Sequence, residues 1–137
     1  MISVEASYSH QAASEGQMRL PTRYTAPHTI DNWRHTRMLM SIAPILQARP
    51  DATWMTVGDG RYGSDAAFLK EQGVKAIATS LTGERLKIAH EMGRIDQWRV
   101  ENAERISLPD SSVDFVLCKE AYHHFPRPPI ALYEMLR

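Results

Sequence analysis

Three glycines, Gly58, Gly60 and Gly63, follow a short apolar run and precede a segment with helical character. Glycine tolerates sharp backbone angles and lets a bound molecule approach the main chain closely. The first N–H groups of the following helix point toward the same place. The spacing indicates a ligand-binding loop, although Tyr62 stands where glycine-rich loops usually have another glycine. A plain strand-to-helix turn without a ligand remains the alternative.

A second group of reactive side chains lies near the end of the chain, where Glu120 is followed by His123 and His124. Imidazole titrates near neutrality, so either histidine could act as a general base. No third residue with metal-ligand spacing is evident, and we expect no metal site. Glu120 is the first choice for a polar pocket group. Cys118 is expected to be a small buried apolar residue rather than a nucleophile.

These residues need a scaffold, and the hydrophobic pattern predicts one. Asp31 is a candidate N-cap for a first helix, which Pro44 should kink or end. From Thr53 onward, short apolar runs alternate with helical segments, which is typical of a doubly wound parallel α/β sheet. Ligands of such sheets bind beyond the carboxyl ends of the strands. We expect strands over 53–57, 74–79, 97–100 and 113–119, and helices over 64–72, 82–92 and 130–137.

The composition is that of one ordinary globular domain. The 137 residues include 16 Lys+Arg and 16 Asp+Glu, so the net charge is near zero and nucleic acid is not an expected partner. The single cysteine excludes an intramolecular disulfide. No apolar run could span a bilayer, and the N-terminus lacks the features of a signal peptide. We therefore expect a cytoplasmic protein with no membrane partner.

Residues 1–30 are polar and aperiodic, and we interpret them as an N-terminal arm or lid on a domain formed by residues 31–137. Tyr8 and Tyr24 of this arm could cover a pocket. Trp33, Arg34 and Arg37 of the first helix could do the same, or could simply pack or face solvent. Arg85 and Lys87 are expected on a solvated helix face.

Together, four segments of the chain resemble a known family. From Thr53 to Arg137 the sequence is similar to the N-terminal half of class I S-adenosylmethionine-dependent methyltransferases of the small-molecule type. The resemblance implies a Rossmann-like fold and the cofactor S-adenosylmethionine, with S-adenosylhomocysteine as its product. The segments that carry it are 55–60, 78–86, 101–104 with 108–109, and 113–118 with 120–125.

The resemblance also implies roles for individual residues. The glycine loop would hold the amino-acid part of the cofactor, residue 80 would lie beside the ribose, and residues 102 and 103 would lie against the adenine. The loop at 119–124 would line the pocket near the methionine part or the acceptor, and one of its histidines could be the base. The cofactor-binding residues expected on this basis are Gly58, Asp59, Gly60, Ser80, Leu81, Asn102, Ala103, Lys119 and Glu120, and the catalytic ones are His123 and His124.

The sequence departs from this family at two carboxylates. The family usually has a carboxylate where this chain has Thr56, and Asp59 inside the loop is a candidate to bind the cofactor's ammonium group instead. The second strand usually ends in Asp or Glu, which accepts hydrogen bonds from the ribose hydroxyls, and here the residue is Ser80. Loss of a charged hydrogen-bond partner typically costs about 1.5–3 kcal/mol, so cofactor binding is expected to be weakened.

The third departure is at the C-terminus, where the family continues into three more strands. The fold is expected to stop after the fourth strand and its helix, which leaves Val113, Phe115, Val116 and Leu117 on an unpaired apolar edge. We expect a fragment, a truncated product, or a homodimer that covers this edge.

The functional prediction is a methyltransferase with a small-molecule acceptor, because the balanced charge argues against a polyanion. The alternatives are a truncated or non-catalytic domain that serves in assembly, with weak or no cofactor binding, and a nicotinamide-binding domain. The pair Asn102-Ala103 followed by Leu108-Pro109 argues against the last of these, since nicotinamide binding does not require it.

Overall fold

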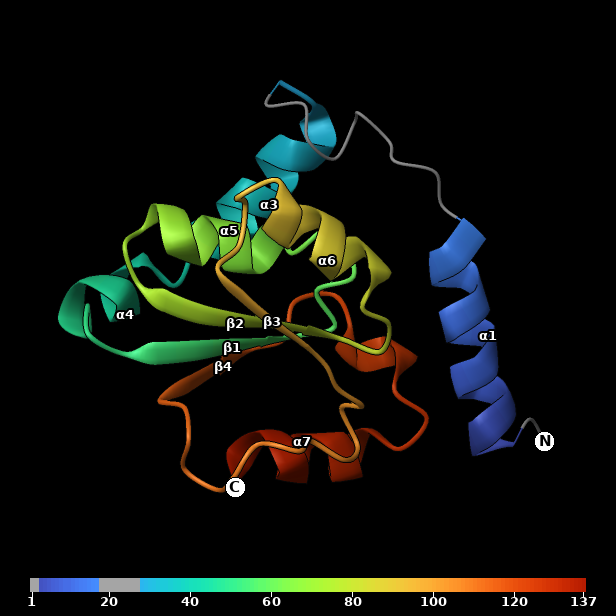
Figure 1. The fold of residues 1–137 in the computed structure, drawn as a ribbon. Helices are drawn as coiled ribbons and strands as arrows, with labels where there is room; N and C mark the ends of the chain where they lie inside the picture. The colour runs from blue at the N-terminus through green and yellow to red at the C-terminus, as the bar shows by residue number, and fades with distance from the viewer. Residues whose placement is uncertain (1–2, 18–27) are drawn as a thin grey trace.

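Four parallel strands form the sheet on which the rest of the chain is assembled (Figure 1). The computed structural model describes residues 3–17 and 28–137. The strand order is β3-β2-β1-β4, so β1 and β2 are central and β3 and β4 are the edges. This arrangement confirms the predicted parallel α/β sheet. The strands are β1 (Thr53–Val57), β2 (Lys75–Ser80), β3 (Gln97–Val100) and β4 (Phe115–Leu117).

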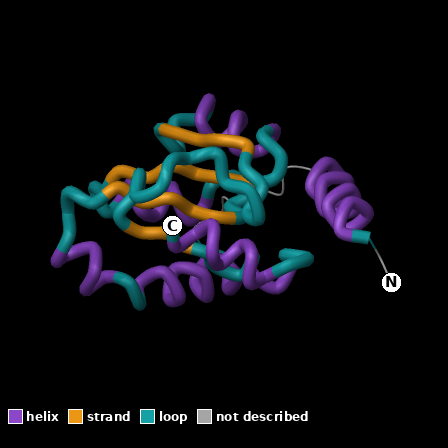
Figure 2. Tube along the Cα trace, turned by 90° about the horizontal axis from the view of Figure 1, so that it is seen from below, coloured by secondary structure: helices purple, strands orange, loops and turns teal. Residues whose placement is uncertain are grey.

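Helices cover both faces of the sheet, which makes the fold doubly wound. Among the described residues, α3, α4, α5 and α6 pack on one face and α7 packs on the other (Figure 1). Seen from the side of α7, the strands lie next to one another and α1 stands beyond one end of them (Figure 2). The elements are α1 (Val4–Gln17), α3 (Ile30–Met40), α4 (Ala43–Ala48), α5 (Ser64–Glu71), α6 (Glu84–Glu91), the short 3₁₀ helix η1 (Tyr122–His124) and α7 (Pro128–Leu136).

The central strand β1 supplies apolar side chains to both layers of the core. Trp54 is 2% exposed and packs with buried residues of α3, α4 and α5, while its ring stacks on Phe115 with 4.6 Å between centroids. Met55 and Val57 point the other way and pack with Ala131 of α7. Successive side chains alternate between the faces of a strand, so a fully apolar strand is expected only where both faces are covered.

Helices α3 and α4 correct one sequence expectation, the N-cap, and confirm another, the break at Pro44. Thr29, not Asp31, is the N-cap of α3, because its hydroxyl accepts a hydrogen bond from the Asn32 N–H at 3.1 Å. Pro44 does interrupt the helix as predicted: α3 ends at Met40, and Pro44 lies in the first turn of α4, where its missing N–H costs nothing.

No helix was predicted within residues 1–30, yet Val4–Gln17 form α1. The helix carries few large apolar residues, so hydrophobic periodicity gave no signal for it. The breakers Pro21 and Pro27 and the candidate covering residue Tyr24 lie outside the described residues.

The edge strand β4 is shorter than predicted. Residues 113–119 were expected to form it, but pairing with β1 runs only from Phe115 to Leu117. Beyond Thr56, which pairs with Leu117, β1 reaches the glycine turn, and the chain after β4 leaves the sheet. In the part of the chain described, β4 has β1 as its one neighbour, so the predicted edge is confirmed. A second copy covering it stays a prediction.

Replacing Gly58 by alanine should destabilise the fold more than replacing Gly73. Both glycines have positive φ, 76° and 82°, so each substitution forces alanine into the left-handed region at a cost of about 1–2 kcal/mol. A Cβ on Gly58 would also overlap the Cβ of Ala121, whereas one on Gly73 would meet nothing within 4 Å. Urea denaturation should therefore show about 1 kcal/mol or more of additional loss for Gly58→Ala. Equal losses would contradict the close packing of the glycine turn against the segment after β4.

Candidate functional site

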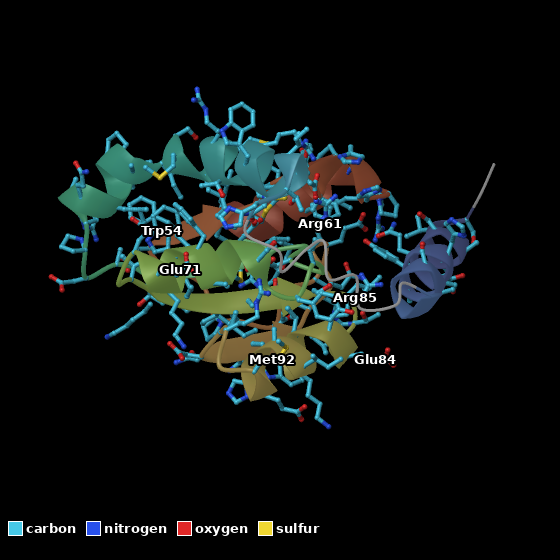
Figure 3. All side chains as sticks on the ribbon, turned by 90° about the horizontal axis from the view of Figure 1, so that it is seen from above. Trp54, Arg61, Glu71, Glu84, Arg85 and Met92 are labelled. Carbon is cyan, nitrogen blue, oxygen red and sulfur yellow. The ribbon has the colours of Figure 1, made fainter. Side chains whose placement is uncertain are left out.

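A cavity of about 410 Å³ opens where the four strands end. Segments following each strand line it, together with His35 of α3 and residues of α1. Figure 3 shows Arg61 and Arg85, two of its lining residues, toward the end of the sheet that faces α1, and Trp54 toward the opposite end. The volume lies in the range of small-molecule and cofactor sites. Of the site residues expected from the sequence, those that line the cavity are Gly58, Asp59, Gly60, Ser80, Leu81, Ala103, Lys119, Glu120 and His124.

The two remaining expected residues, Asn102 and His123, do not line the cavity. The side-chain oxygen of Asn102 instead accepts a hydrogen bond from the Glu104 N–H at 2.9 Å, which fixes the turn after β3. His123 is exposed and its ring lies 3.9 Å from that of His124, centroid to centroid. The structure therefore brings His124, and not His123, to the cavity.

The carboxylate of Asp59 serves the glycine turn itself. One oxygen accepts from the Asp65 N–H at 3.2 Å, and the other accepts from the Ala66 N–H at 2.9 Å and from the Thr56 hydroxyl at 3.0 Å. These bonds cap the N-terminus of α5, whose first N–H groups have no partner within the helix. Asp59 is 2% exposed, and burial raises its pKa despite these donors. These N–H groups of α5 already use the lone pairs with which the Asp59 carboxylate was expected to bind an ammonium group.

A cluster of charged groups forms the side of the cavity near β1 and β4. Lys119 Nζ lies 2.9 Å from Asp65 Oδ1, and the two side chains are 8% and 7% exposed. The same Nζ donates to His35 Nδ1 at 2.7 Å. Burial, followed by the charges of Lys119 and Arg61, lowers the pKa of His35. Glu120, at the rim, pairs with Arg34 and lies 3.3 Å from His35 Nδ1.

The side of the cavity near β2 and β3 is different in character. Ser80 is the last residue of β2 and is 2% exposed, and Leu81 and Ala103 supply apolar surface beside it. Glu101 also lines this side, but its carboxylate accepts from the N–H and the hydroxyl of Ser107, at 2.9 and 2.6 Å. That carboxylate therefore holds the loop after β3 in place.

Helix α1 lies across the mouth of the cavity through Tyr8, His10, Gln11 and Ser14. Gln11 Nε2 donates to the His124 carbonyl at 2.8 Å, which joins α1 to η1. Burial and the nearby Glu104 carboxylate raise the pKa of Tyr8 to about 12. The expectation that Tyr8 covers a pocket agrees with this placement.

Sequence reasoning missed three buried polar residues that helices bring to the cavity, Asp65, His35 and Arg85. Arg85 was expected on a solvated helix face together with Lys87, and this was wrong for Arg85. It is 7% exposed, donates to the Gly60 carbonyl at 3.2 Å and lies 5.8 Å from the centroid of the Tyr62 ring. Nothing local distinguishes these residues from ordinary helix residues, so only the assembled fold reveals them.

Cys118, expected to be a buried apolar residue, is partly buried and packs against the core cluster that contains Met55 and Ala131. Burial raises the pKa of its thiol. Over residues 3–17 and 28–137, no three His, Cys, Asp or Glu side chains gather as metal ligands would. Over the same ranges, no helix has both the length and the apolar character that crossing a bilayer requires.

The Asp65 carboxyl should make stability depend on pH. Burial and then the Asp59 charge raise its pKa from 3.8 to about 6, against the opposing charges of Lys119 and His35. Between these two values the folded chain binds more protons than the unfolded chain, so this group's contribution to the free energy of unfolding falls as pH rises from about 4 to about 6. Wild type should therefore lose stability relative to Asp65→Asn over that interval.

The check is a series of urea denaturations of both proteins between pH 4 and 7. The matched control is Asp96→Asn, which removes the same charge from the exposed Lys70–Asp96 pair, 2.6 Å apart. A difference between wild type and Asp65→Asn that is flat across this range, or that changes in the opposite direction, would contradict the raised pKa.

Comparison with known proteins gives the family. The model of a family described as a methyltransferase domain matches residues 55–137, which is more than half of the chain. The 2-methyl-6-phytyl-1,4-hydroquinone methyltransferase of Synechocystis is 31% identical over 91 residues, covering 64% of this chain and 29% of that protein.

Solved structures agree with the fold. The YcgJ protein of Bacillus subtilis matches with a TM-score of 0.63 and 25% identity, over 75% of this chain and 47% of its own. A SAM-dependent methyltransferase of Aquifex aeolicus shares the fold with a TM-score of 0.59 and 20% identity, over 88% of this chain and 67% of its own. The chain thus spans about half the length of YcgJ and less than a third of the Synechocystis enzyme. With its parallel sheet, glycine turn and cavity at the strand ends, this chain belongs to the methyltransferase domain family.

Proposed function

We propose that this chain binds S-adenosylmethionine in the cavity at the strand ends and forms the cofactor-binding part of a methyltransferase with a small-molecule acceptor. The observation that carries the proposal is the chemical asymmetry of the cavity. Its side at β2 and β3 combines Ser80 with the apolar surface of Leu81 and Ala103, and the charged groups there, Glu101 and Arg85, are bonded to the chain itself. Its side at β1 and β4 holds the ion pair of Asp65 and Lys119. A molecule with a nucleoside at one end and charges at the other fits this distribution.

The residues present suit such a cofactor. An adenosine group placed on the β2 and β3 side meets apolar surface for its base and a hydroxyl of Ser80 for its ribose. The main chain at Gly58 and Gly60 lines the cavity without side chains, and Gly58 packs directly against Ala121. When bound, S-adenosylmethionine supplies an electrophilic methyl group on a positively charged sulfur.

The chain contributes to methyl transfer by placing and shielding the reactants. Tyr8 and Gln11 of α1 and Phe125 after η1 also line the cavity, where they would reduce the contact of bound reactants with water. Correct placement of an acceptor in line with a methyl group accounts for much of the rate in such reactions. The hydrogen bond from Gln11 to the His124 carbonyl keeps α1 attached to the body of the domain.

The acceptor is proposed to be a small molecule that lies on the α1 side of the cavity. The cavity has the volume of a small-molecule site, and the chain has no net charge with which to hold a polyanion. The relative from Synechocystis is named for a hydroquinone, which is a small molecule. Burial and the neighbouring His123 lower the pKa of His124. Its neutral ring can therefore take a proton from the methyl-accepting molecule at pH 7.

The direct test is calorimetric titration of the chain with S-adenosylhomocysteine and, in parallel, with NADH. Binding of S-adenosylhomocysteine with a dissociation constant on the order of micromolar, and no binding of NADH, is expected. Absence of heat with millimolar S-adenosylhomocysteine would contradict the proposal and favour a non-catalytic domain that serves in assembly. Binding of NADH alone would favour a nicotinamide site.

Replacing Ser80 by aspartate should tighten the binding of S-adenosylhomocysteine by about ten- to hundredfold, because a carboxylate accepts charge-assisted hydrogen bonds from both ribose hydroxyls. Ser80→Asn is the matched control, since it has the same shape without the charge and should give a much smaller gain. Calorimetry provides both affinities, and thermal melting confirms that each variant folds. Unchanged or weaker binding by a folded Ser80→Asp variant would place the ribose elsewhere.

A further inference from the structure

We propose that Asp65 and Lys119 together recognise the zwitterionic amino-acid end of the cofactor, with the Asp65 carboxylate facing the cofactor's ammonium and the Lys119 ammonium facing its carboxylate. The inference rests on the proposed function. The two residues that would bind the amino-acid end come from different parts of the chain: Asp65 from the first turn of α5, and Lys119 from the loop after β4.

Asp65 differs from the other buried carboxylates around the cavity, because theirs are occupied by the chain's own donors. Asp59 accepts from two N–H groups of α5 and from a hydroxyl. Glu101 accepts from the N–H and hydroxyl of Ser107. Oδ1 of Asp65 has Lys119 as its ion-pair partner and, within the described residues, no other donor. Asp65 is therefore the buried carboxylate with acceptor capacity left for a ligand.

Lys119 is held in place from the opposite side. Its Nζ lies between Asp65 Oδ1 at 2.9 Å and His35 Nδ1 at 2.7 Å, and its side chain is 8% exposed. An ammonium carries three donors, so these two contacts leave one for a ligand carboxylate. Burial and nearby cations lower the pKa of His35. Its neutral ring therefore accepts a hydrogen bond from Lys119 and positions that side chain without adding charge.

Two carboxylates and one cation lie close together at Asp65. Asp59 and Asp65 bring two carboxylates, Lys119 brings one cation, and His35 is neutral at pH 7. Burial, followed by the charge of Asp59, raises the pKa of Asp65 to about 6. A cation placed beside Asp65 offsets the repulsion from Asp59 locally, and the ammonium of an amino acid is such a cation. Its carboxylate, placed beside Lys119, then completes an alternating set of four charges.

This arrangement distinguishes ligands that share the adenosine group. S-adenosylhomocysteine has both charges of the amino-acid end. Decarboxylated S-adenosylhomocysteine keeps the ammonium alone, and 5′-methylthioadenosine has neither. The pair should therefore favour S-adenosylhomocysteine over the other two, whereas the contacts at Ser80 and Ala103 are available to all three.

The experiment is calorimetry of wild type, Asp65→Asn, Lys119→Met and the control Asp96→Asn with the three ligands at pH 7.5. Asp65→Asn should weaken the binding of S-adenosylhomocysteine about ten- to hundredfold and leave the affinity for 5′-methylthioadenosine within about twofold of the wild-type value. Lys119→Met should weaken the binding of S-adenosylhomocysteine while leaving the affinity for the decarboxylated ligand within about twofold of the wild-type value. Asp96→Asn, which removes an exposed Asp–Lys pair, should change none of them.

The 5′-methylthioadenosine affinity serves as the internal control for folding of the cavity. If wild type binds both S-adenosylhomocysteine and 5′-methylthioadenosine, but Asp65→Asn weakens both equally or neither, the inference fails and the proposed function stands. If wild type binds no adenosine ligand, both fail. Should Asp65→Asn not fold, Lys119→Met decides, and equal losses for S-adenosylhomocysteine and its decarboxylated form overturn the inference.

Discussion

The buried carboxylate of Asp59 is the interaction on which the site depends. It joins the end of β1, through the Thr56 hydroxyl, to the first N–H groups of α5. The glycine turn between these elements is held by this cap, by the contact of Gly58 with Ala121 and by the side chain of Tyr62, which is buried in the core beside Leu86. Without the cap, a buried helix terminus would be left with unsatisfied donors, and neither the turn nor α5 would keep its position.

The fixed turn places chemically different groups on opposite sides of one cavity. Asp65 lies in the first turn of α5 because Asp59 caps that helix, and it is there that Lys119 reaches it from the loop after β4. Ser80, the last residue of β2, and Leu81, which follows it, lie on the other side of β1 and line the cavity with Ala103. The strand order β3-β2-β1-β4 therefore determines the order in which a bound molecule meets apolar, backbone and charged surfaces.

The scaffold of the site was predictable from the sequence, whereas much of its polar interior was not. Short apolar runs and the glycine turn indicate strands and a ligand loop, and Gly58, Gly60, Ser80 and Lys119 do line one cavity. Hydrophobic periodicity could not show α1, which is a largely polar helix. It also could not reveal that the Asp59 carboxylate caps α5 by accepting from N–H groups six and seven residues further along the chain. Asp65 and Arg85 have the local sequence of solvated helix residues, and only tertiary packing buries them.

The most direct test of this account is a crystal structure of the chain with S-adenosylhomocysteine. The account predicts electron density for the adenosine group beside Ser80 and Ala103, with the amino-acid end near Asp65 and Lys119. Density for the ligand outside the cavity, or side chains of α1 filling the cavity in its place, would contradict it.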